Sequence, residues 1–160
     1  MNRQLLQETN QLLMQELPEQ TGIHLNAGAD EPILLDMAEV LVSYDMEQQD
    51  RRVLLGCYWL LLQSIRSHDH LPTHPDHVGR GVLDGDFLQS FYLQFALRHG
   101  FVDLIADLAK TMKLVQIRRA EGSRTIETQL HQRLCRFISK RYLRRYKSKQ
   151  RFKQVTYDVI

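Results

Sequence analysis

The chain has 160 residues, of which 43% are hydrophobic, 25% charged and 8% aromatic. These fractions are ordinary for a folded protein, and they exclude disordered and fibrous classes. A chain of this length can bury enough surface for one core, so we expect a single domain over residues 1–160. Leucine occurs 25 times, against 17 valines and isoleucines together, which favours helices over strands.

Features that report on cellular location point to the cytoplasm. Cys57 and Cys135 both lie in apolar-periodic segments, which predicts buried thiols rather than a disulfide. The longest uncharged apolar run, residues 53–62, is about half of the roughly 20 residues that a membrane span needs. The first residues lack the apolar core of a signal peptide. We therefore expect a cytoplasmic protein without a transmembrane segment.

Six helical segments are predicted from apolar residues that recur every three to four positions. They cover residues 2–17, 32–44, 50–67, 82–99, 101–120 and 123–149. The third is apolar on nearly every side, which is typical of a central helix or of one that contacts another chain. Asp30 is a plausible N-cap for the second helix, and prolines and glycines predict a loop over residues 67–81. Apart from a possible alternation at residues 154–160, nothing indicates a strand, so the expected fold is one all-α helical bundle.

Three groups of acidic residues and histidines could carry metal or acid–base chemistry. Residues 68–77 contain four histidines and two aspartates, but their spacing matches no zinc signature and favours a polar loop. Asp84 and Asp86 fit the first turn of a helix, where carboxylates cap it, better than a Mg²⁺ site. Asp103 and Asp107, four residues apart, fit a solvated helix face better than a pair that holds Mg²⁺ with a diphosphate. We therefore predict no metal site in this chain.

Charge is divided sharply along the sequence. Residues 1–123 hold 10 Lys/Arg and 17 Asp/Glu, a net charge of −7, whereas residues 124–160 hold 11 and 2, a net charge of +9. This basic C-terminal helix and tail carries a candidate docking surface made of Arg136, Lys140, Arg141, Arg144 and Arg145. Clustered cations suit nucleic-acid phosphates, an acidic protein or an anionic membrane surface, and a merely solvated helix end explains them equally well.

One segment resembles a known family. The sequence VLDGDFLQS at residues 82–90 looks like the VLxGDxLxS helix of the all-α trans-prenyltransferases, which build polyprenyl diphosphates. In that family an apolar helix that ends in the motif DDxxD comes before it, and residues 60–69 stand in that place here. Where the family has three aspartates, this chain has Asp69, His70 and Thr73. Asp69 is therefore the one remnant of the first aspartate-rich motif.

Its length and degenerate aspartates make the chain similar to the small subunits, component I, of the two-component hexaprenyl and heptaprenyl diphosphate synthases. The resemblance spans about residues 32–145 and is best over residues 82–118. It implies a truncated trans-prenyltransferase (isoprenoid synthase-like) fold with no catalytic residues and no cofactor of its own. The implied partner is the large catalytic subunit, component II, whose two aspartate-rich motifs hold Mg²⁺. Self-association is expected when that partner is absent.

The resemblance also implies a function. The complex would condense isopentenyl diphosphate onto farnesyl diphosphate and supply a long chain for the side chain of menaquinone. In the catalytic relatives the helix matching residues 82–99 lies at the subunit interface beside the product tunnel. We therefore expect the following residues to meet the partner or to line the tunnel, rather than only to fill this chain's own core: Phe87, Leu88, Phe91, Tyr92 and Phe95. The alternative function is a helical module that binds nucleic acid through the basic C-terminal helix, although sequence-specific binding is not expected.

Overall fold

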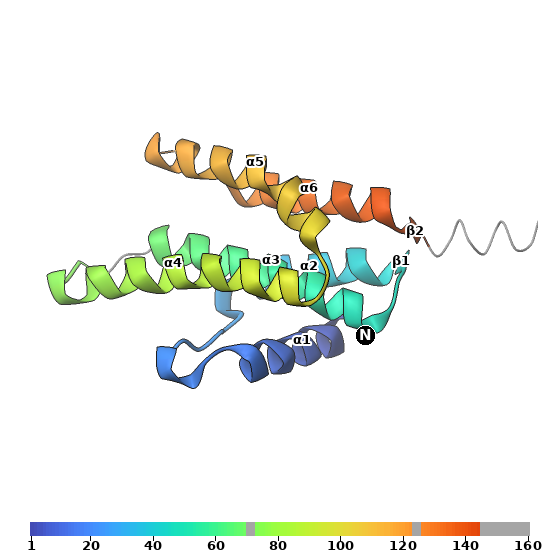
Figure 1. Cartoon of the computed structure of the whole chain (residues 1–160), viewed down its shortest axis with the longest axis horizontal. Helices are drawn as coiled ribbons and strands as arrows, with labels where there is room; N and C mark the ends of the chain where they lie inside the picture. Colours follow the sequence, from blue (N-terminus) through green and yellow to red (C-terminus); the bar gives the residue numbers. More distant parts are fainter. Residues whose placement is uncertain (70–72, 123–125, 145–160) are drawn as a thin grey trace, which may run out of the picture.

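The computed structural model describes residues 1–69, 73–122 and 126–144, and this part of the chain contains six α-helices (Figure 1). The helices are α1 (Asn2–Glu16), α2 (Glu31–Val42), α3 (Gln48–Asp69), α4 (Pro75–Arg98), α5 (Val102–Ala120) and α6 (Ile126–Arg141). Two short 3₁₀ turns, η1 (Glu19–Thr21) and η2 (Gly28–Asp30), lie between α1 and α2. The predicted all-α class is confirmed.

Helix α3 is the centre of the bundle. Every residue from Val53 to Leu62 is buried, and α1, α2 and α4 all pack against this helix. A helix that is apolar on every side needs neighbours on every side, so the central position predicted from its composition is confirmed. Helices α5 and α6 pack on each other and lie on the opposite side of the bundle from α1 (Figure 1).

The connection between α3 and α4 is much shorter than the loop predicted over residues 67–81. Helix α3 continues to Asp69 and α4 begins at Pro75, so most of the predicted loop is helical. A proline fits the first turn of a helix because its missing N–H has no partner there, and a glycine inside a helix costs only about 1 kcal/mol. Asp84 and Asp86 consequently lie well inside α4, and their predicted role as N-terminal caps is wrong.

The sixth helix differs from its predicted range of 123–149. It ends at Arg141, after which the chain becomes extended: β2 (Leu143–Arg144) pairs antiparallel with β1 (Tyr44–Asp45). This small ladder connects the end of α6 to the turn between α2 and α3. The rest of the predicted helix and the alternating residues 154–160 lie outside the described residues.

Two predictions, buried cysteine thiols and the absence of a transmembrane segment, can be compared with the structure. Cys57 is buried in α3, Cys135 is half-buried in α6, and both are free thiols. The prediction of a buried thiol is therefore confirmed for Cys57 and holds only in part for Cys135. Within the ranges that the structure describes, no helix has both the length and the apolar character needed to cross a membrane.

Candidate functional site

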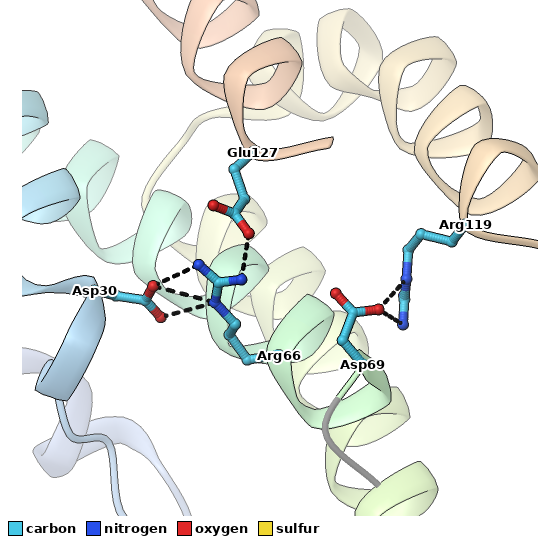
Figure 2. Close-up of polar contacts among 5 residues, drawn as sticks. All are labelled: Asp30, Arg66, Asp69, Arg119 and Glu127. Atoms are coloured by element: carbon cyan, nitrogen blue, oxygen red, sulfur yellow. Dashed lines mark hydrogen bonds and ion pairs between the residues drawn. The ribbon is translucent and has the colours of Figure 1, made fainter. Parts of the chain in front are cut away.

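Asp69, the remnant of the aspartate-rich motif, lies at the C-terminal end of α3 and forms an ion pair with Arg119 of α5 (Figure 2). The Nη2 atom of Arg119 lies 2.7 Å from Asp69 Oδ1, and its Nε atom donates to the same oxygen at 2.8 Å. Mg²⁺ in phosphate chemistry is held by carboxylates that are free to face the substrate. Here the carboxylate faces a guanidinium, which neutralises it.

A second arginine, Arg66, lies one turn before Asp69 and joins three elements (Figure 2). Its Nη2 atom donates to Asp30 Oδ1 at 2.8 Å, and its Nη1 atom pairs with Glu127 of α6. The hydrogen bonds to Asp30 raise the pKa of Arg66 above its usual value. Asp30 occupies the N-cap position of α2, as predicted, but its side chain makes no capping hydrogen bond because its carboxylate is bound by Arg66.

The histidine-rich segment divides into separate contacts. His68 Nε2 lies 3.2 Å from Asp86 Oδ1 of α4, and the rings of His74 and His77 lie 5.4 Å apart. Among the described residues, no three side chains of His, Cys, Asp or Glu converge closely enough to hold a metal ion. His70 lies outside the described residues.

The two aspartates of α5 connect that helix to α6. Arg133 Nη2 lies 2.8 Å from Asp107 Oδ1, and Arg141 pairs with Asp103. Both carboxylates therefore pair with α6, but only Asp107 is half-buried; Asp103 is exposed, so the predicted solvated face is confirmed for Asp103 and is wrong for Asp107. Sequence spacing placed the two acids on one side of α5 correctly, but it gave no signal for the arginines that lie opposite.

A groove runs between α4 and α5, with α3 as its floor. Two adjoining cavities of about 270 and 190 Å³ form it, and both are lined by Gln89, Met112 and Gln116. The first lies at the ion-paired end of the site, beside His68, Asp86 and Arg119. The second is more apolar, with Leu93, Ile105 and Leu108 in its lining. The groove therefore changes from polar to apolar along its length.

Tyr92 lines the apolar part of this groove, and its hydroxyl group is not hydrogen-bonded within the part of the chain that the structure describes. The side chain is almost fully buried, and its hydroxyl has no hydrogen-bond partner among the described residues. Burial raises the pKa of Tyr92 above its usual value, so the hydroxyl stays protonated at neutral pH. An unpaired buried hydroxyl costs roughly 1 to 3 kcal/mol, which a water molecule or a ligand oxygen in the groove could recover.

The apolar residues expected at a partner interface or tunnel are placed mostly in this chain's own core. Leu88, Phe91, Tyr92 and Phe95 are buried, and Phe87 is half-buried against the same cluster. The large apolar side chains that α4 leaves exposed are Leu83, Leu93 and Leu97. A contact between α4 and another chain would therefore begin with these three leucines, while the aromatic residues support them from beneath.

Some cations of the predicted basic docking surface contact other side chains of this chain, and others face water. The guanidinium of Arg141 lies 4.7 Å from the ring centroid of Phe101, and that of Arg144 lies 5.5 Å from the ring of Tyr44. Arg136 and Lys140 are exposed and form no ion pair within the described part of the chain. Arg145 lies outside the described residues.

No family model, curated protein or solved structure matches this chain.

Proposed function

We propose that the chain is the non-catalytic subunit of a two-chain polyprenyl diphosphate synthase. In this role it binds a catalytic partner that carries both aspartate-rich motifs, and it permits that partner to make hexaprenyl or heptaprenyl products for menaquinone. The proposal rests on the resemblance of residues 82–90 to the prenyltransferase helix and on one structural observation, the ion pair between Asp69 and Arg119.

The ion pair supports a non-catalytic role for physical reasons. Ionisation of an allylic diphosphate needs Mg²⁺ ions held by facing carboxylates, which stabilise the leaving group. The carboxylate at the matching position, Asp69, is neutralised by Arg119, and the neighbouring side chain one turn earlier is a second arginine, Arg66. The guanidinium of Arg119 beside Asp69 disfavours bound Mg²⁺ at this carboxylate. These residues do not fit the metal cluster of the catalytic family, so the metal belongs to the partner in this proposal.

The exposed leucines of α4 support a contact with a second chain. Leu83, Leu93 and Leu97 are 69%, 40% and 54% exposed, and at about 100° per residue they lie within an arc of roughly 80° around α4. Leu93 also lines the groove between α4 and α5. Apolar side chains in this arrangement, next to a groove with an apolar end, are typical of a surface that is covered by a partner.

The alternative function, nucleic-acid binding by the C-terminal helix, has weaker support. Phosphate binding needs cations that are free to face the backbone of the nucleic acid. Two of the five proposed cations, Arg141 and Arg144, are held against aromatic rings, and Arg141 is also paired with Asp103.

Reconstitution tests the proposal. The chain is co-expressed with a DDxxD-bearing synthase from the same genome, and products from farnesyl and isopentenyl diphosphates with Mg²⁺ are separated by length. We expect no product from the chain alone and a longer product from the pair than from the partner alone. Leu93→Glu and Leu97→Glu should abolish co-purification, because a charge buried in an apolar interface costs several kcal/mol.

Met14→Glu provides the matched control, since Met14 is an exposed apolar residue on α1, away from the groove. This variant should co-purify as well as the unmodified chain does. Prenyl transfer by the purified single chain would contradict the non-catalytic role. Normal assembly and product length with both leucine variants would contradict the proposed surface.

A further inference from the structure

The outward face of α5 combines exposed apolar side chains with cations. The face opposite the buried stripe of this helix contains Val102, Ala106, Lys110, Lys113 and Ile117, which recur every three or four residues. Val102 and Ile117 are 59% and 45% exposed, and Leu114, beside this face, is 51% exposed. Water therefore meets three large apolar side chains on a helix whose other face is already well buried.

The charge that remains on the same surface is positive, because the two aspartates of α5 form ion pairs with arginines of α6. Asp103 and Asp107 pair with Arg141 and Arg133, which removes both carboxylates from the electrostatic balance of the surface. The exposed cations that form no ion pair within the described residues are Lys110, Lys113 and Arg118 on α5 and Arg136 and Lys140 on α6. The α5–α6 surface, defined by these five cations with Val102, Leu114 and Ile117, is therefore basic.

We infer that the α5–α6 surface docks on an anionic lipid bilayer. Cations on a helix are drawn to acidic headgroups, and apolar side chains between them enter the boundary between headgroups and acyl chains. Lysine suits this position because its aliphatic stem lies along apolar surface while its ammonium group stays in the headgroup layer. Phosphate binding to nucleic acid explains the cations but gives no role to Leu114 and Ile117.

The helix would lie in the plane of the bilayer and would not cross it. Of the helices in the described ranges, none is long and apolar enough to span a membrane. Figure 1 shows α5 and α6 together on one side of the molecule, away from α1, so a flat surface could approach them without meeting α1. This inference does not depend on the proposed enzyme complex, because the isolated chain carries the whole surface.

Vesicle sedimentation with the full chain tests the inference. The probes are vesicles of phosphatidylcholine alone and of phosphatidylcholine mixed with phosphatidylglycerol. We expect binding to the anionic vesicles only, and weaker binding as salt rises. Lys110→Gln and Lys113→Gln should each weaken binding about fivefold, since a cation near an anionic surface contributes about that factor. Leu114→Ser and Ile117→Ser should each weaken it about tenfold through lost apolar burial.

Matched controls come from α4. Arg80→Gln and Leu83→Ser remove a cation and an exposed leucine outside the α5–α6 surface, and both should leave vesicle binding unchanged. Unchanged binding by the four α5 variants would overturn the inference. So would tighter binding to duplex DNA that Leu114→Ser and Ile117→Ser do not weaken, because the surface would then be a nucleic-acid surface.

Discussion

Gly56 of α3 faces Phe95 of α4 where the two helices cross, and a β-carbon at Gly56 would lie 3.0 Å from Phe95 Cε1. The same carbon would lie 3.3 Å from Cδ2 of Leu13 on α1. Three helices therefore meet at one glycine. Phe95 is fully buried, and a ring in a close-packed interior has little space into which it can turn.

Gly56→Ala should destabilise the chain. Forcing an extra methyl group into a packed core costs about 1 to 3 kcal/mol, and alanine recovers about 1 kcal/mol of helix propensity over glycine. We expect a net loss of up to about 2 kcal/mol, measured as a lower midpoint of urea unfolding with an unchanged slope.

Gly79→Ala in α4 is the control for this change. No atom lies within 4 Å of a β-carbon placed at Gly79, so only the helix propensity should change. We expect stabilisation of up to about 1 kcal/mol. If Gly56→Ala stabilises the chain as much as Gly79→Ala does, α3 and α4 do not approach each other closely at Gly56.

Arg66 should contribute more to stability than an arginine on the open surface. Arg66→Met leaves the carboxylates of Asp30 and Glu127 partly buried and without their cation. Removing one partner of a fully buried pair costs about 3 to 5 kcal/mol. Because the side chain of Arg66 is still 27% exposed, we expect a smaller loss of roughly 2 to 3 kcal/mol in thermal or urea unfolding.

Arg3→Met is the comparison for Arg66→Met. Arg3 pairs with Glu31 at 3.1 Å, but the arginine side chain is largely exposed. An exposed pair contributes between 0 and about 1 kcal/mol. Equal losses from the two variants would mean that the Arg66 cluster holds α3, η2 and α6 together no better than a surface ion pair does.

Local sequence signals predicted the helices better than their ends. The sequence of α3 predicted a central helix because a helix that is buried on all sides needs apolar residues on all sides. The segment at residues 67–81 was misassigned because prolines and glycines are usually read as breakers, although Pro75 only opens α4. The glycine of the GD sequence, Gly85, has a packing role: a β-carbon there would lie 2.6 Å from Nε2 of His68 on α3, so a larger residue would displace that ring.

The ion pairs of the candidate site could not be predicted from spacing. Arg66 and Asp30 are 36 residues apart, and Arg119 and Asp69 are 50 residues apart. Periodicity reports which residues share a helix face, but it does not report which faces of two distant helices meet. The sequence identified Asp69 as a remnant, and only the fold showed which cation faces it.

The free energy of unfolding should decrease at acidic pH, in part because His131 becomes protonated. Its Nδ1 atom lies 3.1 Å from the hydroxyl of Tyr58, and burial lowers the pKa of His131 although Asp36 opposes this shift. The folded state thus favours the neutral ring. The contribution is fully present above the unfolded pKa of about 6.5 and is lost as pH falls through the lower folded value.

His131→Gln isolates this contribution. The unfolding free energy of the unmodified chain should decline as pH falls below about 6.5, with a slope from this group below about 1.4 kcal/mol per pH unit. The variant should have a shallower slope in that window. The decline at still lower pH should remain in the variant. The hydrogen bond from Gln48 lowers the pKa of Glu8, and the pKa of Glu16 is lowered because its bonds with His99 and Arg98 outweigh its desolvation, so protonation of either carboxylate destabilises the fold. Identical slopes for both proteins would contradict a neutral His131 in the fold.

Phe95 and Leu97, two residues apart on α4, should separate the core from the proposed partner surface. Phe95 is fully buried, whereas Leu97 is 54% exposed. Phe95→Ala leaves a cavity beside Gly56 and should lower the free energy of unfolding by about 3 to 5 kcal/mol. Leu97→Ala removes a side chain that mostly faces water, so the loss should stay within about 0.5 kcal/mol.

The same two variants should behave differently in assembly with the proposed catalytic partner. Leu97→Ala should weaken association, because truncating an apolar residue at an interface centre costs about 1 to 2 kcal/mol of binding free energy. Phe95→Ala should weaken association only to the extent that it unfolds the chain, which thermal unfolding of the single chain measures separately. If Leu97→Ala changes neither association nor product length, the exposed leucines of α4 do not meet the partner. The contact would then have to involve another face, since the aromatic residues beneath them are occupied by the core.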